Sequence, residues 1–305
     1  MSRPSRLGLF VFSGLILAVT ACGAPTSGSR SGGRPTYYLA LGDSLAAGYG
    51  SGTTPSDREC RDHNADRSGA RGYVCLFFAR LRRVSPNLRL VNLALASDPG
   101  EDSCSFLHVI SCAGSRRRRD VAPGDRSPFA FTREAQISAA MGVLRSHRQP
   151  GVISLDIGGN DFAPLLAETA TGKLNRATRG LRAAERRFAR NLRRIVRQLR
   201  GSAPQAVIIL ADQYDPLSGV PAAVLGPEGA VILRDAQKAT ESMRRSVLSV
   251  SRRYRAGVAD VGARFKGRAL ALTRIAQGAN VHPSPAGYRV YAALLWQTYR
   301  AAPRP

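Results

Sequence analysis

The sequence has 305 residues, 44% of them hydrophobic, and a formal net charge of +24 at pH 7. This length and apolar content suffice for one large domain with a full core and argue against a disordered chain. Lysine occurs only at Lys173, Lys238 and Lys266, so nearly all the positive charge is arginine. Arginine in place of lysine is typical of a GC-rich genome. The net excess itself leaves an anionic lipid or cell-envelope polymer open as a partner.

The N-terminus has the pattern of an export signal. Two arginines precede an apolar stretch, residues 7–19, that is too short for a membrane-spanning helix. The stretch is followed by the letters TAC, ending at Cys22, and this run resembles the lipobox of bacterial lipoproteins. A plain secretory signal cut nearby is the alternative. We predict a lipoprotein signal peptide in residues 1–22, lipidation of Cys22 and a flexible Gly/Ser/Pro tether in residues 23–35, hence an extracytoplasmic, membrane-anchored protein.

The other four cysteines fit an exported protein. An even number of cysteines in an oxidising compartment predicts two disulfide bonds, for which three pairings are possible. We favour the local pairing, which closes short loops: Cys60 with Cys75 and Cys104 with Cys112. The C-x2-C spacing of a zinc site is absent, so we expect no metal and no other cofactor.

Apolar runs alternate with helical patterns along the rest of the chain. The runs are apolar on both faces, as in the strands of a covered parallel sheet: residues 36–42, 88–94, 151–157, 205–211 and 256–261. Apolar residues at steps of three and four predict helices over residues 176–200, 231–254 and about 286–299. With right-handed crossovers, residues 36–301 are therefore predicted to form an α/β domain. Its architecture is a three-layer α/β/α, doubly wound, flavodoxin-like parallel sheet of about five strands.

Polar and glycine residues follow the predicted strands, where doubly wound sheets bind their ligands. The first strand ends in GDSL, with Ser44, and Gly100 comes after the second. The third runs into GGND, with Asn160, and His282 lies near the C-terminus in NVHPSPAGY. We expect these residues to meet on one rim of the sheet, where they supply a hydroxyl, backbone donors, an amide and an imidazole.

This set resembles the SGNH, or GDSL, hydrolase superfamily of serine esterases and lipases. Residues 42–45 match its first block letter for letter, and Gly158-x-Asn160-Asp161 matches its third block, G-x-N-D. The segment from His282 to Tyr288 resembles the last block, and Gly100 matches the second less tightly. Each block alone is weak, but four blocks in order across residues 37–291 are specific.

The resemblance implies that Ser44 is a nucleophile activated by His282, because a serine hydroxyl reacts only when a base takes its proton. It also implies an oxyanion hole made by the backbone N–H groups of Ser44 and Gly100 and the side-chain amide of Asn160. Taken singly, the serine could cap a helix, the histidine could lie on the surface and the asparagine could serve a turn. The other histidines match no block of the family: His63, His108 and His147.

One position departs from the family pattern. An aspartate usually stands three residues before the histidine, where this chain has Ala279. We favour a backbone carbonyl around residues 278–280 as the group that orients the imidazole, which leaves a Ser-His dyad. The side chain of Asn280 and the carboxylate of Asp98 or Asp260 are the alternatives.

The sequence thus predicts a serine hydrolase that cleaves carboxylic esters through an acyl-Ser44 intermediate, with Asp43 and Asp161 bracing the loops. A carbohydrate deacylase and a catalytically inactive surface protein that binds polymer are the alternatives. The run Arg116 to Arg119 lacks interleaved aromatic residues, so we expect a solvated loop and no nucleic-acid partner. We expect the chain to be a monomer.

Overall fold

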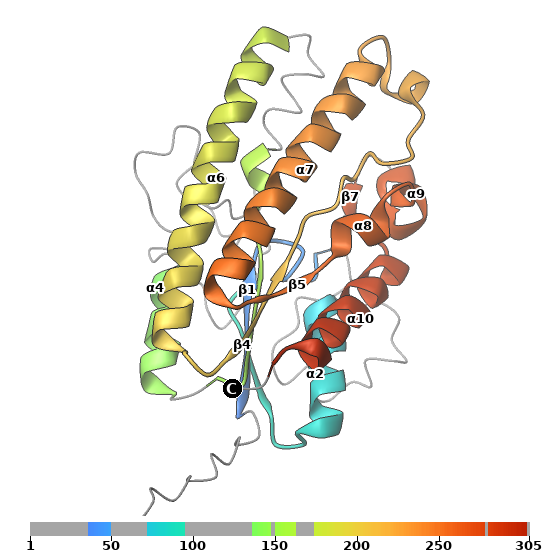
Figure 1. Ribbon diagram of the computed structural model, residues 1–305. Helices are drawn as coiled ribbons and strands as arrows, with labels where there is room; N and C mark the ends of the chain where they lie inside the picture. Colours follow the sequence, from blue (N-terminus) through green and yellow to red (C-terminus); the bar gives the residue numbers. More distant parts are fainter. Residues whose placement is uncertain are drawn as a thin grey trace, which may run out of the picture. The chain divides into compact units, whose positions relative to one another are not determined.

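A five-stranded parallel sheet lies at the centre of the structure, which is a computed structural model (Figure 1). The structure describes residues 36–49, 72–94, 136–147, 150–162, 174–277 and 280–303, with only the backbone of residues 174–179. All of them belong to one compact unit, Gly33–Pro305. The strands are β1 (Tyr37–Gly42), β2 (Arg89–Asn92), β3 (Val152–Asp156), β4 (Val207–Ala211) and β5 (Gly257–Ala259).

The strand order is β2-β1-β3-β4-β5, with every neighbouring pair parallel. This is the flavodoxin-like order of a doubly wound sheet, and it confirms the predicted fold class. The chain moves outward from β1 in both directions, first to β2 and then to β3. The carboxyl ends of β1 and β3 are therefore the place where this topology leaves a crevice for a ligand.

Helices cover both faces of the sheet (Figure 1). One layer contains α4 (Gln136–Ser146), α6 (Leu174–Ser202) and α7 (Gly229–Tyr254), and the other contains α2 (Tyr73–Val84) and α10 (Pro285–Ala301). Side chains of β1 alternate between two core clusters. Leu39 and Leu41 pack in the cluster with α4, α6 and α7, whereas Tyr38 and Ala40 pack in the cluster with α2 and α10. This double burial explains why the strands are apolar on both faces.

The three helices predicted from periodicity are confirmed as α6, α7 and α10. The sequence did not predict α2 and α4, nor several short elements. These are η1 (Ala222–Leu225), α8 (Val261–Phe265), α9 (Ala269–Leu272), β6 (Thr273–Arg274), η2 (Ile275–Gln277) and β7 (Asn280–Pro283). A segment of two to five residues is too short to show a period, which is why these elements have no sequence signature.

The start of α10 fixes the position of the segment that carries His282. The Ser284 side chain caps the helix by accepting from the backbone N–H of Gly287, and Pro285 occupies the first turn. A Cβ atom on Gly287 would lie 2.0 Å from the carbonyl oxygen of Leu272, so only glycine allows this approach of α10 to α9. None of the described helices has the length and apolar composition needed to cross a bilayer.

Candidate active site

Ser44 lies on a tight turn directly after β1. Gly42 has a φ of +150°, and a Cβ atom there would lie 2.4 Å from the carbonyl oxygen of Asp156 at the end of β3. The backbone N–H of Asp43 donates to the same oxygen at 3.1 Å. The backbone N–H of Tyr49 then donates to the Ser44 carbonyl at 2.8 Å, within a helical turn. The glycine of GDSL is therefore required because β1 ends in contact with the end of β3.

Gln136, the first residue of α4, holds this turn in place. Its Oε1 accepts from the backbone N–H of Gly42 at 2.8 Å, and its Nε2 donates to the carbonyl of Gly42 at 2.9 Å. The side chain is fully buried. The sequence does not predict this residue, because a lone glutamine 94 positions away from its partner carries no recognisable motif.

The structure brings Ser44 and His282 together across 238 residues of sequence. The Ser44 Oγ lies 2.9 Å from the His282 Nε2, and both residues are partly exposed. His282 lies on β7, which pairs with β6 immediately before α10. A hydroxyl and an imidazole in this contact can form the nucleophile–base pair of a serine hydrolase.

Asn280 orients the imidazole. Its Oδ1 accepts from the backbone N–H of His282 at 3.1 Å and lies 2.8 Å from the His282 Nδ1. A backbone N–H can only donate, so this atom is the amide oxygen and not the nitrogen. The Nδ1 must then carry a proton, which leaves Nε2 unprotonated and able to accept from Ser44. Of the alternatives for the missing aspartate, the geometry supports the side chain of Asn280 rather than the favoured backbone carbonyl; residues 278 and 279 lie outside the described residues.

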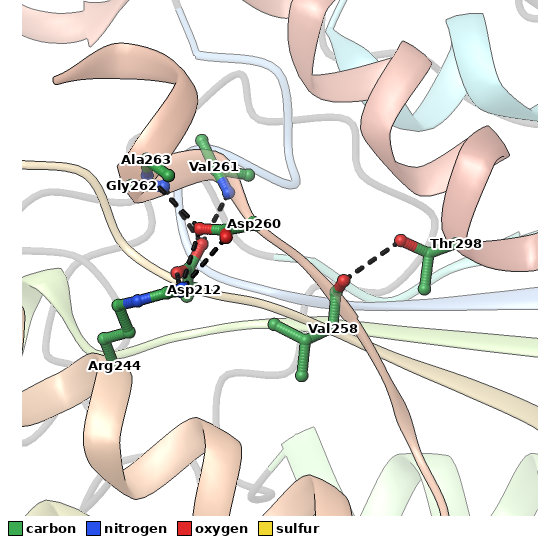
Figure 2. A network of polar contacts seen from close by, with 8 residues as sticks. All are labelled: Asp212, Arg244, Val258, Asp260, Val261, Gly262, Ala263 and Thr298. Atoms are coloured by element: carbon green, nitrogen blue, oxygen red, sulfur yellow. Dashed lines mark hydrogen bonds and ion pairs between the residues drawn. The ribbon is translucent and has the colours of Figure 1, made fainter.

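Asp260 has other partners, as Figure 2 shows. Its two carboxylate oxygens accept from the Arg244 guanidinium at 2.8 and 2.9 Å, and one of them also caps α8 through the N–H of Ala263. The same guanidinium binds Asp212 at 2.9 Å, whose pKa burial raises to about 6. Asp260 thus anchors α7 to the ends of β4 and β5, which argues against its role as a third catalytic member. Asp98 lies outside the described residues.

The side chain of Asp43, in the GDSL segment, contacts the segment that contains Asn160 and Asp161. Its carboxylate accepts from the backbone N–H of Leu45 at 3.0 Å and is 3.5 Å from the amide nitrogen of Asn160. Burial raises the pKa of Asp43 to about 7, and the negative charge of Asp161 adds to this shift. Asn160 and Asp161 follow β3 in a helical turn, where Asp161 is buried and its backbone N–H donates to the Gly158 carbonyl at 3.0 Å. The carboxyl group of Asp43 therefore braces the two loops that flank Ser44.

A second buried carboxyl, on Asp156, lies at the end of β3. Its side chain is fully buried and accepts from the Gln213 Nε2. Burial raises the pKa of Asp156 well above its ordinary value, and the neighbouring Asp43 raises it further. Neither Asp156 nor Gln213 was predicted from the sequence. The signal available for Asp156 was its position as an acidic residue at the end of an otherwise apolar strand, before the letters IGGND. A carboxyl group inside a buried strand needs a specific partner.

Tyrosine side chains brace both sides of the serine–histidine pair. The Tyr49 ring lies 4.4 Å from the His282 ring, centroid to centroid, with an angle of 42° between their planes. The Tyr288 hydroxyl donates to the Tyr49 carbonyl at 2.7 Å, and the Tyr214 hydroxyl donates to the Val281 carbonyl at 2.6 Å. The loop after Ser44 and the strand that carries His282 are thus both tied to buried tyrosines.

Several predicted residues lie outside the described residues: Cys22, Cys60, Gly100, Cys104, Cys112 and Arg116 to Arg119. Cys75 is fully buried on α2. The other three cysteines of the two proposed disulfides lie outside the described residues, so both pairings stay predictions. Within the described ranges, no group of three or more His, Cys, Asp or Glu residues is placed to hold a metal ion.

Comparison with known proteins agrees with the fold. Residues 40–290 match the model of the GDSL-like Lipase/Acylhydrolase family, and the chain belongs to this family. It is a serine ester hydrolase of the GDSL lipase and esterase type. No curated protein sequence matches it.

Solved structures with the same fold include lipases and esterases. The extracellular lipase from Streptomyces rimosus is 17% identical with a TM-score of 0.58, and the match covers 86% of this chain and 99% of that one. Phospholipase A1 from Streptomyces albidoflavus is 19% identical with a TM-score of 0.53, covering 87% and 99%. An acetylxylan esterase from Geobacillus stearothermophilus is 17% identical with a TM-score of 0.51, covering 88% and 95%.

Proposed function

We propose that this protein hydrolyses carboxylic esters through an acyl-enzyme intermediate on Ser44, with His282 as the general base. The contact of 2.9 Å between the Ser44 Oγ and the His282 Nε2 is the observation that carries the proposal. Asn280 supports it, because its amide oxygen selects the tautomer of His282 that can take a proton from serine. The reactive groups are then Ser44 and His282, with Asn280 as an uncharged orienting residue in place of the usual aspartate.

In the first half of the reaction, the Ser44 Oγ attacks the ester carbonyl carbon while its proton moves to the His282 Nε2. The carbonyl oxygen becomes an oxyanion, and His282 becomes an imidazolium. When the tetrahedral intermediate collapses, the bond to the alcohol oxygen breaks and that oxygen takes the proton from Nε2. The products of this half are the free alcohol and an ester between the acyl group and Ser44.

Donors for the oxyanion are available beside Ser44. In the part of the chain that the structure describes, the backbone N–H of Ser44 donates to no acceptor, so it is available for a ligand. The Asn160 amide, 3.5 Å from the Asp43 carboxylate, and the backbone N–H of Gly100 are the other two proposed donors. Losing one such donor typically raises the barrier by about 2.7 to 4 kcal/mol.

In the second half, water attacks the acyl carbon and gives one proton to the His282 Nε2. Collapse of the second intermediate breaks the bond to Oγ, which takes that proton back. The carboxylic acid leaves, and Ser44 and His282 return to their starting states. No atom is left over, and no co-reactant other than water is needed.

The surface beside the catalytic pair favours an apolar acyl group. The Tyr49 ring contacts the His282 ring and is 46% exposed. Its free face can cover the chain of a bound acyl group, which favours an acyl ester with several carbons over an acetyl group. A panel of p-nitrophenyl esters of increasing acyl length, together with acetylated xylan, tests this choice. Faster hydrolysis of acetylated xylan would favour the carbohydrate deacylase instead.

A fluorophosphonate probe, which reacts only with activated serines, tests the enzyme assignment. We expect the wild type to be labelled and Ser44→Ala and His282→Gln to remain unlabelled. His147→Gln is the matched control, because His147 is an exposed histidine at the end of α4. Absence of labelling in folded wild-type protein would favour a binding protein of the same fold without catalytic activity.

We also propose that the chain is exported and anchored by lipid at Cys22. The signal pattern and the lipobox-like run support this, as does an even number of the remaining cysteines. The basic surface fits a location beside anionic lipids or anionic envelope polymers. Cys22→Ala should move the protein from the membrane fraction to the soluble fraction of expressing cells. If the variant stays with the membrane, the lipid anchor is wrong.

A further inference from the structure

Helix α6 presents a line of arginines on its outer side. Its arginines are Arg176, Arg179, Arg182, Arg186, Arg187, Arg190, Arg193, Arg194, Arg197 and Arg200, and Glu185 is its single acidic residue. Among them, Arg182, Arg186, Arg190, Arg193 and Arg197 are exposed and follow each other at steps of three and four residues. At 1.5 Å per residue this line is about 22 Å long, opposite the buried face with Phe188 and Ile195.

A groove lies alongside this line, between α6 and α7, which run side by side in Figure 1. Its volume is about 280 Å³. Arg186 and Arg193 line it from α6, and Arg245 lines it from α7. The α7 side also supplies three serines: Ser242, Ser246 and Ser249. Glu185 is the only acidic residue in the lining.

The three arginines of the groove are available for a ligand. None of them forms an ion pair or hydrogen bond with another of the described residues. By contrast, Arg244, the residue next to Arg245, is fully engaged by Asp212 and Asp260. One guanidinium group can donate two parallel N–H hydrogen bonds to two oxygens of a phosphate group. Serine hydroxyls can donate to the remaining oxygens. The groove therefore has the donors that a phosphate group needs.

The same surface argues against two other partners. A helix face that docks on a membrane combines basic residues with apolar side chains that insert into it. Among the described side chains, the exposed large apolar residues all lie outside α6 and α7: Tyr49, Val84, Val224, Leu270 and Val281. Single-stranded nucleic acid needs aromatic rings on which bases stack. The aromatic residues of the two helices are Phe188, which is buried, and Tyr254 at the end of α7.

We propose that the groove between α6 and α7 binds a linear polymer of phosphate groups, with Arg186, Arg193 and Arg245 as the central contacts. The flanking arginines of α6 contact successive phosphates along the polymer. This site lies on the helical layer of α6 and α7 and does not use Ser44 or His282. It would hold the hydrolase on an anionic polymer, and its existence does not depend on the proposed reaction.

Binding of inorganic polyphosphate to the full chain, measured by calorimetry at two salt concentrations, tests the proposal. The variant Arg186→Gln/Arg193→Gln/Arg245→Gln should weaken binding by about tenfold or more and reduce the dependence on salt. The control Arg89→Gln/Arg289→Gln/Arg300→Gln removes the same charge from exposed positions on β2 and α10. It should weaken binding by less than about threefold. Ester hydrolysis by both variants reports that they are folded.

Equal loss in the two variants would overturn the site, because binding would then follow net charge alone. Tighter arginine-dependent binding to phosphatidylglycerol vesicles than to polyphosphate would also overturn it, in favour of a membrane surface. Tighter arginine-dependent binding to duplex DNA would do the same in favour of nucleic acid. Ser44→Ala should bind polyphosphate like the wild type, so a failure of the proposed reaction is separable from a failure of this site.

Discussion

At the scale of single residues, His282 is oriented by an uncharged amide and not by a carboxylate. An aspartate would both select the tautomer and stabilise the imidazolium that forms during the reaction. Asn280 does the first through its Oδ1, 2.8 Å from Nδ1, but carries no negative charge. We therefore expect a smaller dependence on this residue than a triad aspartate shows.

Asn280→Ala should lower kcat by about ten- to a hundredfold, against the roughly ten-thousandfold loss known for a triad aspartate. Asn280→Asp should raise the pKa of His282, because a carboxylate favours the charged imidazolium. The acidic limb of the kcat/KM profile should then move to higher pH. Steady-state kinetics between pH 5 and 9 measure both effects. An alanine variant as active as the wild type would show that another group orients His282.

We expect Tyr49 to supply part of the stabilisation that the missing carboxylate would give. Its ring lies 4.4 Å from the ring of His282, within the range for a cation–π contact once the imidazole is protonated. At an exposed site this contact contributes about 0.5–1 kcal/mol, so Tyr49→Leu should lower kcat by about two- to fivefold. The pKa of His282, followed by NMR in a Ser44→Ala background, should fall in the same variant.

Tyr49→Phe is the matched control for that variant, because it keeps the ring and loses only the hydroxyl. It should retain the kcat and the His282 pKa of the wild type. If phenylalanine and leucine behave alike, the ring contributes only by packing.

At the scale of secondary-structure elements, α4 supports the turn that carries the proposed nucleophile, through Gln136. Gln136→Leu would leave the backbone N–H and C=O of Gly42 buried without partners, at a cost of about 1–3 kcal/mol for each group. We expect a lower midpoint of urea unfolding and a fall in kcat with little change in KM, because Ser44 loses its support. Gln237→Leu on the exposed face of α7 is the control and should leave both unchanged. A stable and fully active Gln136 variant would contradict this role.

At the scale of the whole molecule, buried carboxyl groups make stability depend on pH. Burial raises the pKa of Asp43 from 3.8 to about 7 and that of Asp212 to about 6. The folded state therefore holds these protons to higher pH than the unfolded state does. Their contribution to stability is complete below about pH 4 and is lost as the pH rises toward 7.

The free energy of unfolding should accordingly fall between pH 4.5 and 7.5, by at most about 1.4 kcal/mol per pH unit for each group. Urea unfolding at several pH values measures the slope, and Asp43→Asn should make it shallower. Glu241→Gln, which changes an exposed residue of α7, should leave the slope unchanged. A slope that Asp43→Asn does not alter would show that this carboxyl ionises equally in the folded and unfolded states.

Much of the architecture could be predicted from local pattern. The central strands β1, β3 and β4 lie in apolar runs because helices cover both faces of the sheet, and α6 and α7 show their period over seven turns or so. The short β6–β7 pair and α9 could not be predicted, since their few residues adopt these forms only against α10. Local pattern and family resemblance also pointed to Ser44 and Asn160, which directly follow buried strands, and resemblance to the last family block pointed to His282.

Tertiary structure alone decided how those residues work together. The carboxyl group of Asp43, the amide of Gln136 and the ring of Tyr49 gain their roles from partners on other elements, and no spacing in the sequence records such contacts. Asn280 was one of several alternatives that the sequence left open, and the structure selects it by its contact with the His282 ring. The sequence by itself determined which residue types follow each strand. The tautomer of His282 depends on distances of a few ångströms, and these follow from the packing of β7 between β6 and the loop after Ser44.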